Sequence, residues 1–242
     1  MNDILHFQQL ASTNTYLEQQ LQCQNRANLP DGLIVMTDFQ TGGRGRQSNK
    51  WFSEKGKNLL MSILIYPQLP VEAQFRVTEW ISLAMAEHLR QNVGMEAEIK
   101  WPNDIYIHGK KIAGILISHR WHGMEIESSV IGIGLNLNQE CFPDTLPNPT
   151  SVLLETGIRS DIRETAIRIR EGLARLRGTG AEILHEQYQQ LLYRRHIPAR
   201  YTDTRSGETF EGILEGTDER GLLAIRCGNT LRNYELNGII YC

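Results

Sequence analysis

The chain has 242 residues, of which 40% are hydrophobic and 22% charged, a composition typical of a globular protein. The formal net charge of −3 does not indicate a protein that coats nucleic acid. Four scattered cysteines, without a CxxC pair or a nearby histidine at metal spacing, argue against structural zinc and a disulfide framework and favour the cytoplasm. No apolar run approaches the roughly 20 residues of a membrane helix, and the first residues lack a signal-peptide pattern.

The first third of the chain shows strand and helix patterns separated by a glycine-rich loop. Thr15 and Glu18 have the spacing of a capping box, which predicts that a helix begins at Thr15. Apolar residues at roughly helical spacing predict a second helix after residue 71. The expected elements up to residue 91 are a helix over 15–23, a strand over 33–39, a loop over 41–50, a strand over 58–66 and a helix over 72–91.

Residues 96–117 predict three short strands, the last two joined by a two-residue turn at His108-Gly109. In that register Lys111 lies opposite Tyr106, and Ala113 lies opposite Asp104. Side chains alternate between the two faces of a strand, so these four residues share one face, and the isoleucines at 105, 107 and 112 share the other. The pattern predicts a polar site with a carboxylate and an ammonium group, mounted on a rigid apolar sheet.

A second hairpin is expected to turn near His122-Gly123 and to return along a strand over 125–138. Ile131, Ile133, Leu135 and Leu137 face one side of this strand. The opposite side carries Val130, Gly132, Gly134, Asn136 and Asn138, so two glycines leave room for a ligand there. The alternative is an ordinary solvent-exposed face with glycine bulges.

The C-terminal third changes in character after Pro198. Before it, Asp161 and Glu164 predict the start of a helix that reaches about Ala174, and a further helix is expected over 181–194. After it, short strands alternate with turns, which predicts a small β-barrel. We therefore expect an α+β fold with a first domain over residues 1–195 and a small domain over 196–242.

The loop over 42–51 combines glycines with Arg44, Arg46 and Trp51. Glycine permits close approach of the backbone to a ligand, and arginine suits carboxylate or phosphate groups. The alternative is a surface loop with solvated arginines. By themselves Ser12, Thr13 and Asn14 are better explained as a helix cap than as a binding site, and Gln40 is uninformative by itself.

Together these stretches resemble the biotin protein ligases. The matching residues, in the family's order, are Ser12-Thr13-Asn14, the loop from Phe39 to Arg46 with Trp51, Lys100-Trp101-Pro102-Asn103-Asp104, Lys111-Ile112-Ala113-Gly114-Ile115-Leu116 and the strand from Gly132 to Asn138. The resemblance implies a mixed, mostly antiparallel sheet with flanking helices, as in class II aminoacyl-tRNA synthetases and biotin ligases, followed by a small SH3-like barrel.

The resemblance also implies an activity. Biotin and ATP with Mg²⁺ would give biotinyl-5′-AMP, and the biotinyl group would pass to a lysine of a biotin carboxyl carrier protein or domain. Lys111, Arg46 and Asp104 are the implied catalytic residues. ATP would be bound by Arg44, Arg46, Lys111 and Asn136. Asn136 would lie near the Mg²⁺ that accompanies ATP, but no residue is assigned as a metal ligand. The biotin-binding set is Ser12, Thr13, Asn14, Gln40, Gly43, Arg44, Gly45, Arg46, Trp51, Lys111 and Gly114.

One departure concerns Ser48-Asn49, where many members of the family carry Gly-Arg, so the loop could close differently. The Ser-Thr-Asn motif begins at residue 12, so we expect a short form that acts as a ligase without a DNA-binding domain, as a monomer or homodimer, with neither nucleic acid nor membrane as partner. Two alternatives stay open. One is a lipoate or octanoate ligase or transferase, and the other is a non-catalytic biotin or nucleotide sensor.

Overall fold

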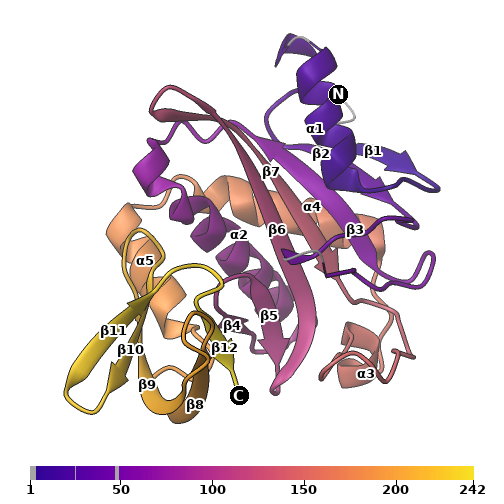
Figure 1. Ribbon diagram of the computed structural model, residues 1–242. Helices are drawn as coiled ribbons and strands as arrows, with labels where there is room; N and C mark the ends of the chain where they lie inside the picture. Colours follow the sequence, from indigo (N-terminus) through magenta and orange to yellow (C-terminus); the bar gives the residue numbers. More distant parts are fainter. Residues whose placement is uncertain (1–3, 25, 47–48) are drawn as a thin grey trace.

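The computed structural model describes residues 4–24, 26–46 and 49–242. Its centre is a seven-stranded sheet with the strand order β1-β2-β3-β7-β6-β5-β4 (Figure 1). Among these strands β1 and β2 pair in parallel and the other pairs are antiparallel, which confirms the expected mixed, mostly antiparallel sheet. The strands are β1 (Ile4–Phe7), β2 (Leu33–Thr37), β3 (Leu59–Ile65), β4 (Glu98–Lys100), β5 (Asp104–Ile107), β6 (Lys110–His122) and β7 (Glu125–Leu135).

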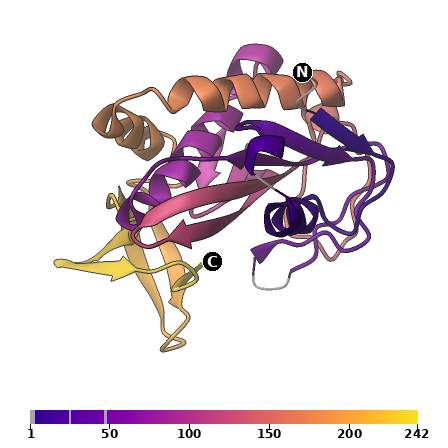
Figure 2. The same cartoon turned by 90° about the horizontal axis from the view of Figure 1, so that it is seen from above.

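Helices cover both faces of this sheet. Figure 2 shows α1 on one side of the sheet and α2 with α4 on the other. The α-helices are α1 (Thr13–Cys23), α2 (Phe75–His88), α3 (Val152–Thr156), α4 (Ile162–Leu176) and α5 (Ala181–Gln190). Short 3-10 turns lie at Arg26–Asn28 and Val71–Ala73, and a π-helical turn over Leu89–Val93 extends α2.

The core follows the period-two alternation of the strands. Ile131 and Ile133 of β7 point into the larger core under α2 and α4, whereas Val130 points to the α1 side and packs there with Leu17 and Leu64. All seven residues of β3 are buried, because β3 lies in the middle of the sheet with helices on both faces. The predicted alternation of β7 is confirmed.

Two details predicted for the first helix and the main sheet are wrong. Helix α1 begins at Thr13 rather than Thr15, because Ser12 is the N-cap and its Oγ accepts a hydrogen bond from the Thr15 backbone N–H at 3.4 Å. The turn at His108-Gly109 and the pairing of Lys111 with Tyr106 are confirmed, but a bulge at Ile112 shifts the register so that Gly114 lies opposite Asp104. Ala113 therefore faces the core, where it is fully buried, and Gly114 takes the place on the polar face.

The last part of the chain forms a five-stranded antiparallel sheet with the order β11-β10-β9-β8-β12. Its strands are β8 (Pro198–Asp203), β9 (Thr209–Thr217), β10 (Leu223–Cys227), β11 (Thr230–Tyr234) and β12 (Ile239–Tyr241). In the described pairings β11 and β12 are the two edges, so the closure expected of a barrel is not seen. This sheet lies beside β4 and β5 and is continuous with the larger core through Tyr201, Leu214 and Ile225.

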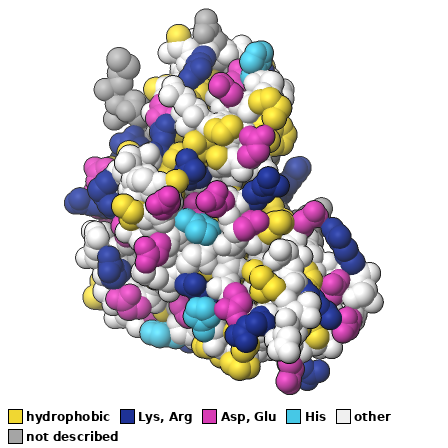
Figure 3. Space-filling view, turned by 90° about the vertical axis from the view of Figure 1, so that its left-hand side faces the viewer, with side chains coloured by type: hydrophobic (Ala, Val, Ile, Leu, Met, Phe, Trp, Pro, Cys, Tyr) yellow, Lys and Arg dark blue, Asp and Glu magenta, His cyan; other side chains and the backbone are white. Residues whose placement is uncertain are grey.

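Acidic and basic side chains are interspersed on the face drawn in Figure 3, and neither charge forms a large continuous patch there. All four cysteines are free thiols. Within the described ranges, no helix is long and apolar enough to cross a membrane.

Candidate functional site

A cavity of about 450 Å³ opens on the α1 face of the main sheet. It is bounded by the start of α1, the glycine-rich loop, the β5–β6 hairpin, β7 and the turn before β12. Its lining includes Ser12, Thr13, Asn14, Gln40, Arg44, Gly45, Arg46, Asn49, Lys50, Trp51, Met61, Trp101, Pro102, Asn103, Asp104, Lys111, Gly114, Gly132, Gly134, Thr204, Asn237, Ile239 and Ile240.

One end of the cavity is a network of uncharged polar groups. Asn14 Oδ1 lies 2.5 Å from Ser62 Oγ, and Asn14 Nδ2 donates to the Leu116 carbonyl at 3.0 Å. Gln40 Oε1 accepts the Thr13 backbone N–H at 2.9 Å. Asn14 sits over Gly132, where an added Cβ would lie 2.2 Å from Asn14 Oδ1. The network holds amide and hydroxyl groups in fixed positions, which suits recognition of a small polar ring.

The middle of the cavity has an apolar wall formed by Trp51. Its indole packs on two glycines of the sheet, because a Cβ on Gly134 would lie 2.4 Å from Trp51 Cε2 and one on Gly114 would lie 3.0 Å from Cζ3. Trp51 Nε1 is buried without a hydrogen-bond partner. The Trp51 backbone N–H donates to the Gly43 carbonyl at 3.1 Å, so the glycine-rich loop fixes where the indole lies.

The other end of the cavity is charged. Lys111 Nζ lies 2.6 Å from Asp104 Oδ1 and 5.8 Å from the centre of the Trp51 ring. Arg46 Nη2 donates to Asn237 Oδ1 at 2.8 Å, which connects the loop to the C-terminal sheet. Burial lowers the pKa of Arg46, and the charge of Asp104 partly opposes this shift. The cations Lys111 and Arg46 therefore lie at an end of the cavity that holds one carboxylate, Asp104, which leaves positive charge available for an anionic ligand.

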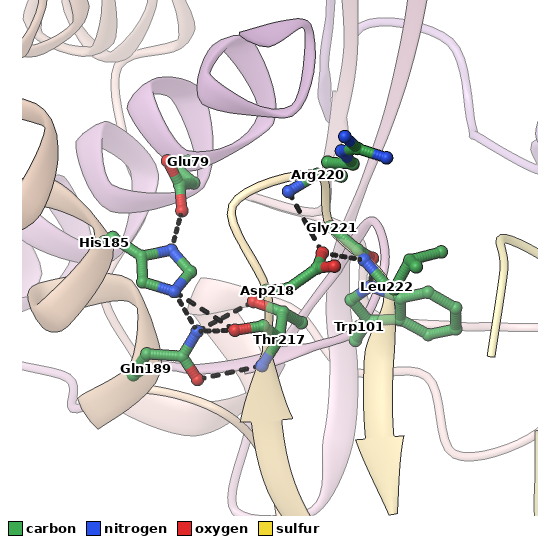
Figure 4. A network of polar contacts seen from close by, with 9 residues as sticks. All are labelled: Glu79, Trp101, His185, Gln189, Thr217, Asp218, Arg220, Gly221 and Leu222. Atoms are coloured by element: carbon green, nitrogen blue, oxygen red, sulfur yellow. Dashed lines mark hydrogen bonds and ion pairs between the residues drawn. The ribbon is translucent and has the colours of Figure 1, made fainter. Parts of the chain in front are cut away.

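The segment from Trp101 to Asp104 is held from two sides. Asn103 is paired with Ile115 of β6 twice, through its backbone carbonyl at 2.8 Å and through Nδ2 at 3.0 Å. Trp101 Nε1 donates to the Gly221 carbonyl at 3.0 Å, as Figure 4 shows. These bonds fix the backbone that carries Asp104 between the main sheet and the C-terminal sheet.

Thr217, which precedes the turn that receives Trp101, is bonded to α5, and α5 is bonded to α2 (Figure 4). His185 Nδ1 of α5 lies 2.6 Å from Glu79 Oε1 of α2, and Gln189 Nε2 donates to the Thr217 carbonyl at 2.9 Å. Burial raises the pKa of Glu79, and the hydrogen bond to His185 partly offsets the shift. This network lies outside the cavity and supports the position of the C-terminal sheet.

Most residues singled out from the sequence meet at this cavity. Every candidate lines it except Gly43, which lies behind Trp51, and Asn136. Asn136 is buried outside the lining, where Nδ2 donates to the Thr150 carbonyl at 2.9 Å and Oδ1 has no hydrogen-bond partner among the described residues. Two residues, Ser48 and Asn49, differ from the pattern common in biotin protein ligases. Ser48 lies outside the described residues, and Asn49 lines the cavity.

Sequence reasoning missed two kinds of contributor. Ser62 supports Asn14, and its signal was one polar residue within the apolar run of β3. Thr204, Asn237, Ile239 and Ile240 come from the C-terminal sheet, and nothing local in the sequence connects them to residues 12–134.

The acidic groups of the site are few. Within residues 4–24, 26–46 and 49–242, no three His, Cys, Asp or Glu side chains lie together as a metal site. Among the described residues that line the cavity, Asp104 is the acidic one, and it is already paired with Lys111. This donor set fits Mg²⁺ held mainly by phosphate oxygens and water, the usual mode for this ion at nucleotide sites.

Comparison with known proteins identifies the relatives of this chain. Residues 6–136 match the model of the biotin/lipoate A/B protein ligase family. The bifunctional ligase/repressor BirA of Bacillus subtilis is 38% identical over 137 residues, which cover 55% of this chain and 42% of BirA. The biotin–[acetyl-CoA-carboxylase] ligase of Paracoccus denitrificans is 30% identical over 203 residues, covering 79% of this chain and 83% of that protein.

The fold comparison extends over the whole chain. The biotin protein ligase of Aquifex aeolicus, solved in complex with biotin and ATP, superposes with a TM-score of 0.79 at 22% identity and covers 100% of this chain and 99% of that one. The expected ligase-like architecture is thereby confirmed. The chain spans about half the length of the BirA relatives, 42–49%. The family match covers more than half of the chain, so the chain belongs to the biotin/lipoate A/B protein ligase family.

Proposed function

We propose that this chain activates biotin with ATP to biotinyl-5′-AMP and transfers the biotinyl group to a lysine of a biotin carboxyl carrier protein or domain. The observation that carries the proposal is the order of groups along one cavity: a polar network at Asn14, an apolar wall at Trp51, and the cations Lys111 and Arg46. Biotin has a polar ureido ring, an apolar body and chain, and a carboxylate, in the same order.

The first step joins two anions, so it needs positive charge at their junction. A carboxylate oxygen of biotin attacks the α-phosphorus of ATP, and pyrophosphate leaves. Lys111 would contact both the carboxylate and the α-phosphate, and Arg44 and Arg46 would contact the phosphates. Asp104, at 2.6 Å, holds the Lys111 ammonium in place. When Mg²⁺ is bound with ATP, it supplies further charge neutralisation on the phosphate oxygens.

The second step is aminolysis of the mixed anhydride. The amine of the carrier lysine attacks the carbonyl carbon, an amide bond forms, AMP leaves, and the amine loses a proton. Asp104 is the carboxylate closest to Lys111 and is the acceptor that we propose for that proton. Trp51 and the residues of the glycine-rich loop would cover the anhydride and exclude water.

The roles proposed for the uncharged groups follow their places in the cavity. Ser12, Thr13, Asn14 and Gln40 would bind the biotin ring, and Gly43, Gly45 and Gly114 would let the backbone and Trp51 approach it. Asn136 would serve the nucleotide end through its unpartnered Oδ1. We propose residues 1–195 as the catalytic domain and 196–242 as a second domain that contributes Asn237 to the cavity.

The free cysteines support a reducing compartment, and we propose the cytoplasm as the site of action. We propose that the chain acts as a monomer or a homodimer, two states that sedimentation distinguishes.

Biotin-dependent exchange of pyrophosphate with ATP tests the proposal. We expect exchange with biotin, and transfer of biotin to a carrier domain when one is added. Exchange with lipoate or octanoate but not biotin would move the chain to the lipoate branch of the same family. Binding of biotin without exchange or transfer would favour the sensor alternative.

A further inference from the structure

A partly buried carboxylate outside the cavity is hydrogen-bonded to both segments that hold Lys111. Glu155 of α3 has a side chain that is only 10% exposed. Its Oε1 accepts hydrogen bonds from Thr150 Oγ1 at 2.5 Å and from Lys110 Nζ at 3.1 Å, and its Oε2 lies 3.0 Å from His108 Nδ1. One carboxylate thus joins the β5–β6 turn to the segment over 148–150.

The segment over 148–150 pairs directly with the backbone of Lys111. The Lys111 N–H donates to the Asn148 carbonyl at 2.7 Å, and the Thr150 N–H donates to the Lys111 carbonyl at 2.9 Å. Strand β7 ends its pairing with β6 at Leu135, opposite Ala113, so this segment replaces β7 as the neighbour of Lys111. Asn136 holds the same segment through the Thr150 carbonyl.

Lys111 needs such support because the regular ladder fails beside it. The bulge at Ile112 interrupts the pairing of β5 with β6 directly after Lys111. A residue at a bulge has fewer ladder bonds to fix its direction. The position of the Lys111 ammonium beside Asp104 and Trp51 therefore depends on the 148–150 segment.

The charge of Glu155 is stable in this setting. Burial by itself raises the pKa of the carboxyl, but the hydrogen bonds from Thr150, His108 and Lys110, together with the charge of Lys110, lower it to about 2. Glu155 is thus ionised at neutral pH and accepts all three bonds. It lies behind Lys111 and does not line the cavity.

We infer that Glu155 is a positioning residue for Lys111: through Thr150 and the β5–β6 turn it fixes the backbone from which the Lys111 ammonium reaches the reacting oxygens. The inference rests on the proposed function, because the role of Lys111 does. It predicts that loss of Glu155 slows the chemical step and leaves recognition of the ring at the Asn14 end unchanged.

The test uses four variants and one control in the full chain. Glu155→Ala removes all three bonds, and Glu155→Gln keeps an acceptor but removes the charge. Thr150→Val removes one bond at nearly constant volume, and Thr150→Ser restores the hydroxyl. Glu140→Ala is the control, since it breaks the exposed ion pair between Glu140 and Arg159, 2.7 Å apart, which touches neither segment.

For each variant we measure kcat and KM for biotin in ATP–pyrophosphate exchange, and the hydrogen exchange of the Lys111 and Thr150 amides. We expect kcat to fall about tenfold in Glu155→Ala and about threefold in Thr150→Val, with KM for biotin within about twofold of wild type, because a shift of about 1 Å at a reacting group affects the rate more than binding elsewhere. Thr150→Ser and Glu140→Ala should match wild type. Both amides should exchange faster in Glu155→Ala.

The inference is overturned if folded Glu155→Ala keeps kcat within about twofold of wild type, or if Glu140→Ala loses as much activity. If Glu155→Ala does not fold, the Thr150 pair decides, and equal kcat in Thr150→Val and Thr150→Ser overturns the inference. If wild type exchanges with lipoate and not biotin, the proposed function fails and the same comparison is made with lipoate. If neither acid supports exchange, an unchanged Lys111 amide in Glu155→Ala overturns the inference.

Discussion

Replacing Gly132 by alanine tests the polar end of the cavity most directly. A Cβ at this position would lie 2.2 Å from Asn14 Oδ1 and 2.8 Å from Asn14 Nδ2. Carbon and oxygen atoms do not approach so closely, so the Asn14 side chain must move by about 1 Å. Such a movement breaks the contact with Ser62 Oγ at 2.5 Å and the bond to the Leu116 carbonyl at 3.0 Å.

The expected cost follows from those losses. Two neutral hydrogen bonds contribute about 2 kcal/mol together, and overpacking of a buried site adds about 1–2 kcal/mol. We therefore expect Gly132→Ala to lower the free energy of unfolding by about 3 kcal/mol. If biotin binds at this end, loss of about 2 kcal/mol of recognition raises its Kd about 30-fold.

The assay is biotin titration calorimetry combined with denaturant unfolding. Gly180→Ala is the matched control, because a Cβ there meets nothing within 4 Å, and it should bind biotin as wild type does. Asn14→Ala removes the group that collides, so the double variant with Gly132→Ala should lose much less than the sum of the two single variants. A Kd for Gly132→Ala within about threefold of wild type, or full additivity in the double variant, would refute the reasoning.

Three further predictions concern charged groups. Lys111→Ala should lower pyrophosphate exchange by about 10²- to 10³-fold with an unchanged circular dichroism spectrum, and near-normal exchange would contradict the role of Lys111. Because the pKa of Glu155 is lowered to about 2, its ionised form stabilises the fold above the unfolded pKa of 4.5 and this contribution disappears as pH falls from 4.5 towards 2. The difference in free energy of unfolding between wild type and Glu155→Gln should therefore be constant near neutral pH. It should shrink by about 2 kcal/mol between pH 4.5 and pH 2, a value that allows for the solvent exposure of Lys110 and His108. A difference that stays constant down to about pH 2 would contradict this. His185→Ala should leave the buried Glu79 carboxylate without its partner and cost about 3 kcal/mol near pH 7. The loss should become smaller as the pH falls, because burial raises the pKa of Glu79 and lets the carboxylate protonate at a higher pH than an ordinary glutamate; a loss in urea unfolding that does not change between neutral and acid pH would exclude the charge of Glu79 as the cause.

The parts of the fold that could be predicted are those set by local alternation. Strand β7 alternates apolar side chains with glycines, and its two faces are as expected. The Lys111–Tyr106 pairing followed from a two-residue turn, which fixes register by itself. Asn14, Gln40 and Trp51 were assembled into one site by the family resemblance rather than by any local pattern.

The errors occur where distant segments decide a local structure. The bulge at Ile112 is accompanied by bonds from Asn103 to Ile115 and by pairing of Lys111 with residues 148–150, nearly 40 positions along the chain. Alternation alone could not place Ala113 in the core. Asn237 reaches Arg46 across 191 positions, so its place in the cavity could be seen only in the folded chain.

The shape of the cavity depends on pairs of residues. In each pair a glycine on a strand leaves space, and a side chain from another segment fills that space. Gly132 is filled by Asn14, and Gly134 and Gly114 are filled by Trp51. The sheet fixes the backbone on one side of each pair, whereas the start of α1 or the glycine-rich loop brings the partner. A larger residue at any of these glycines must therefore displace a ligand-facing group rather than merely reduce the volume of the cavity. Lys111 lies at the charged end, beside the region filled by Trp51 and away from the region filled by Asn14, and the 148–150 segment fixes its backbone. Changes at Gly134 or Gly114 should therefore alter mainly kcat, and changes at Gly132 mainly KM for biotin. Comparison of kcat with KM across these glycines would map which region contacts the reacting atoms.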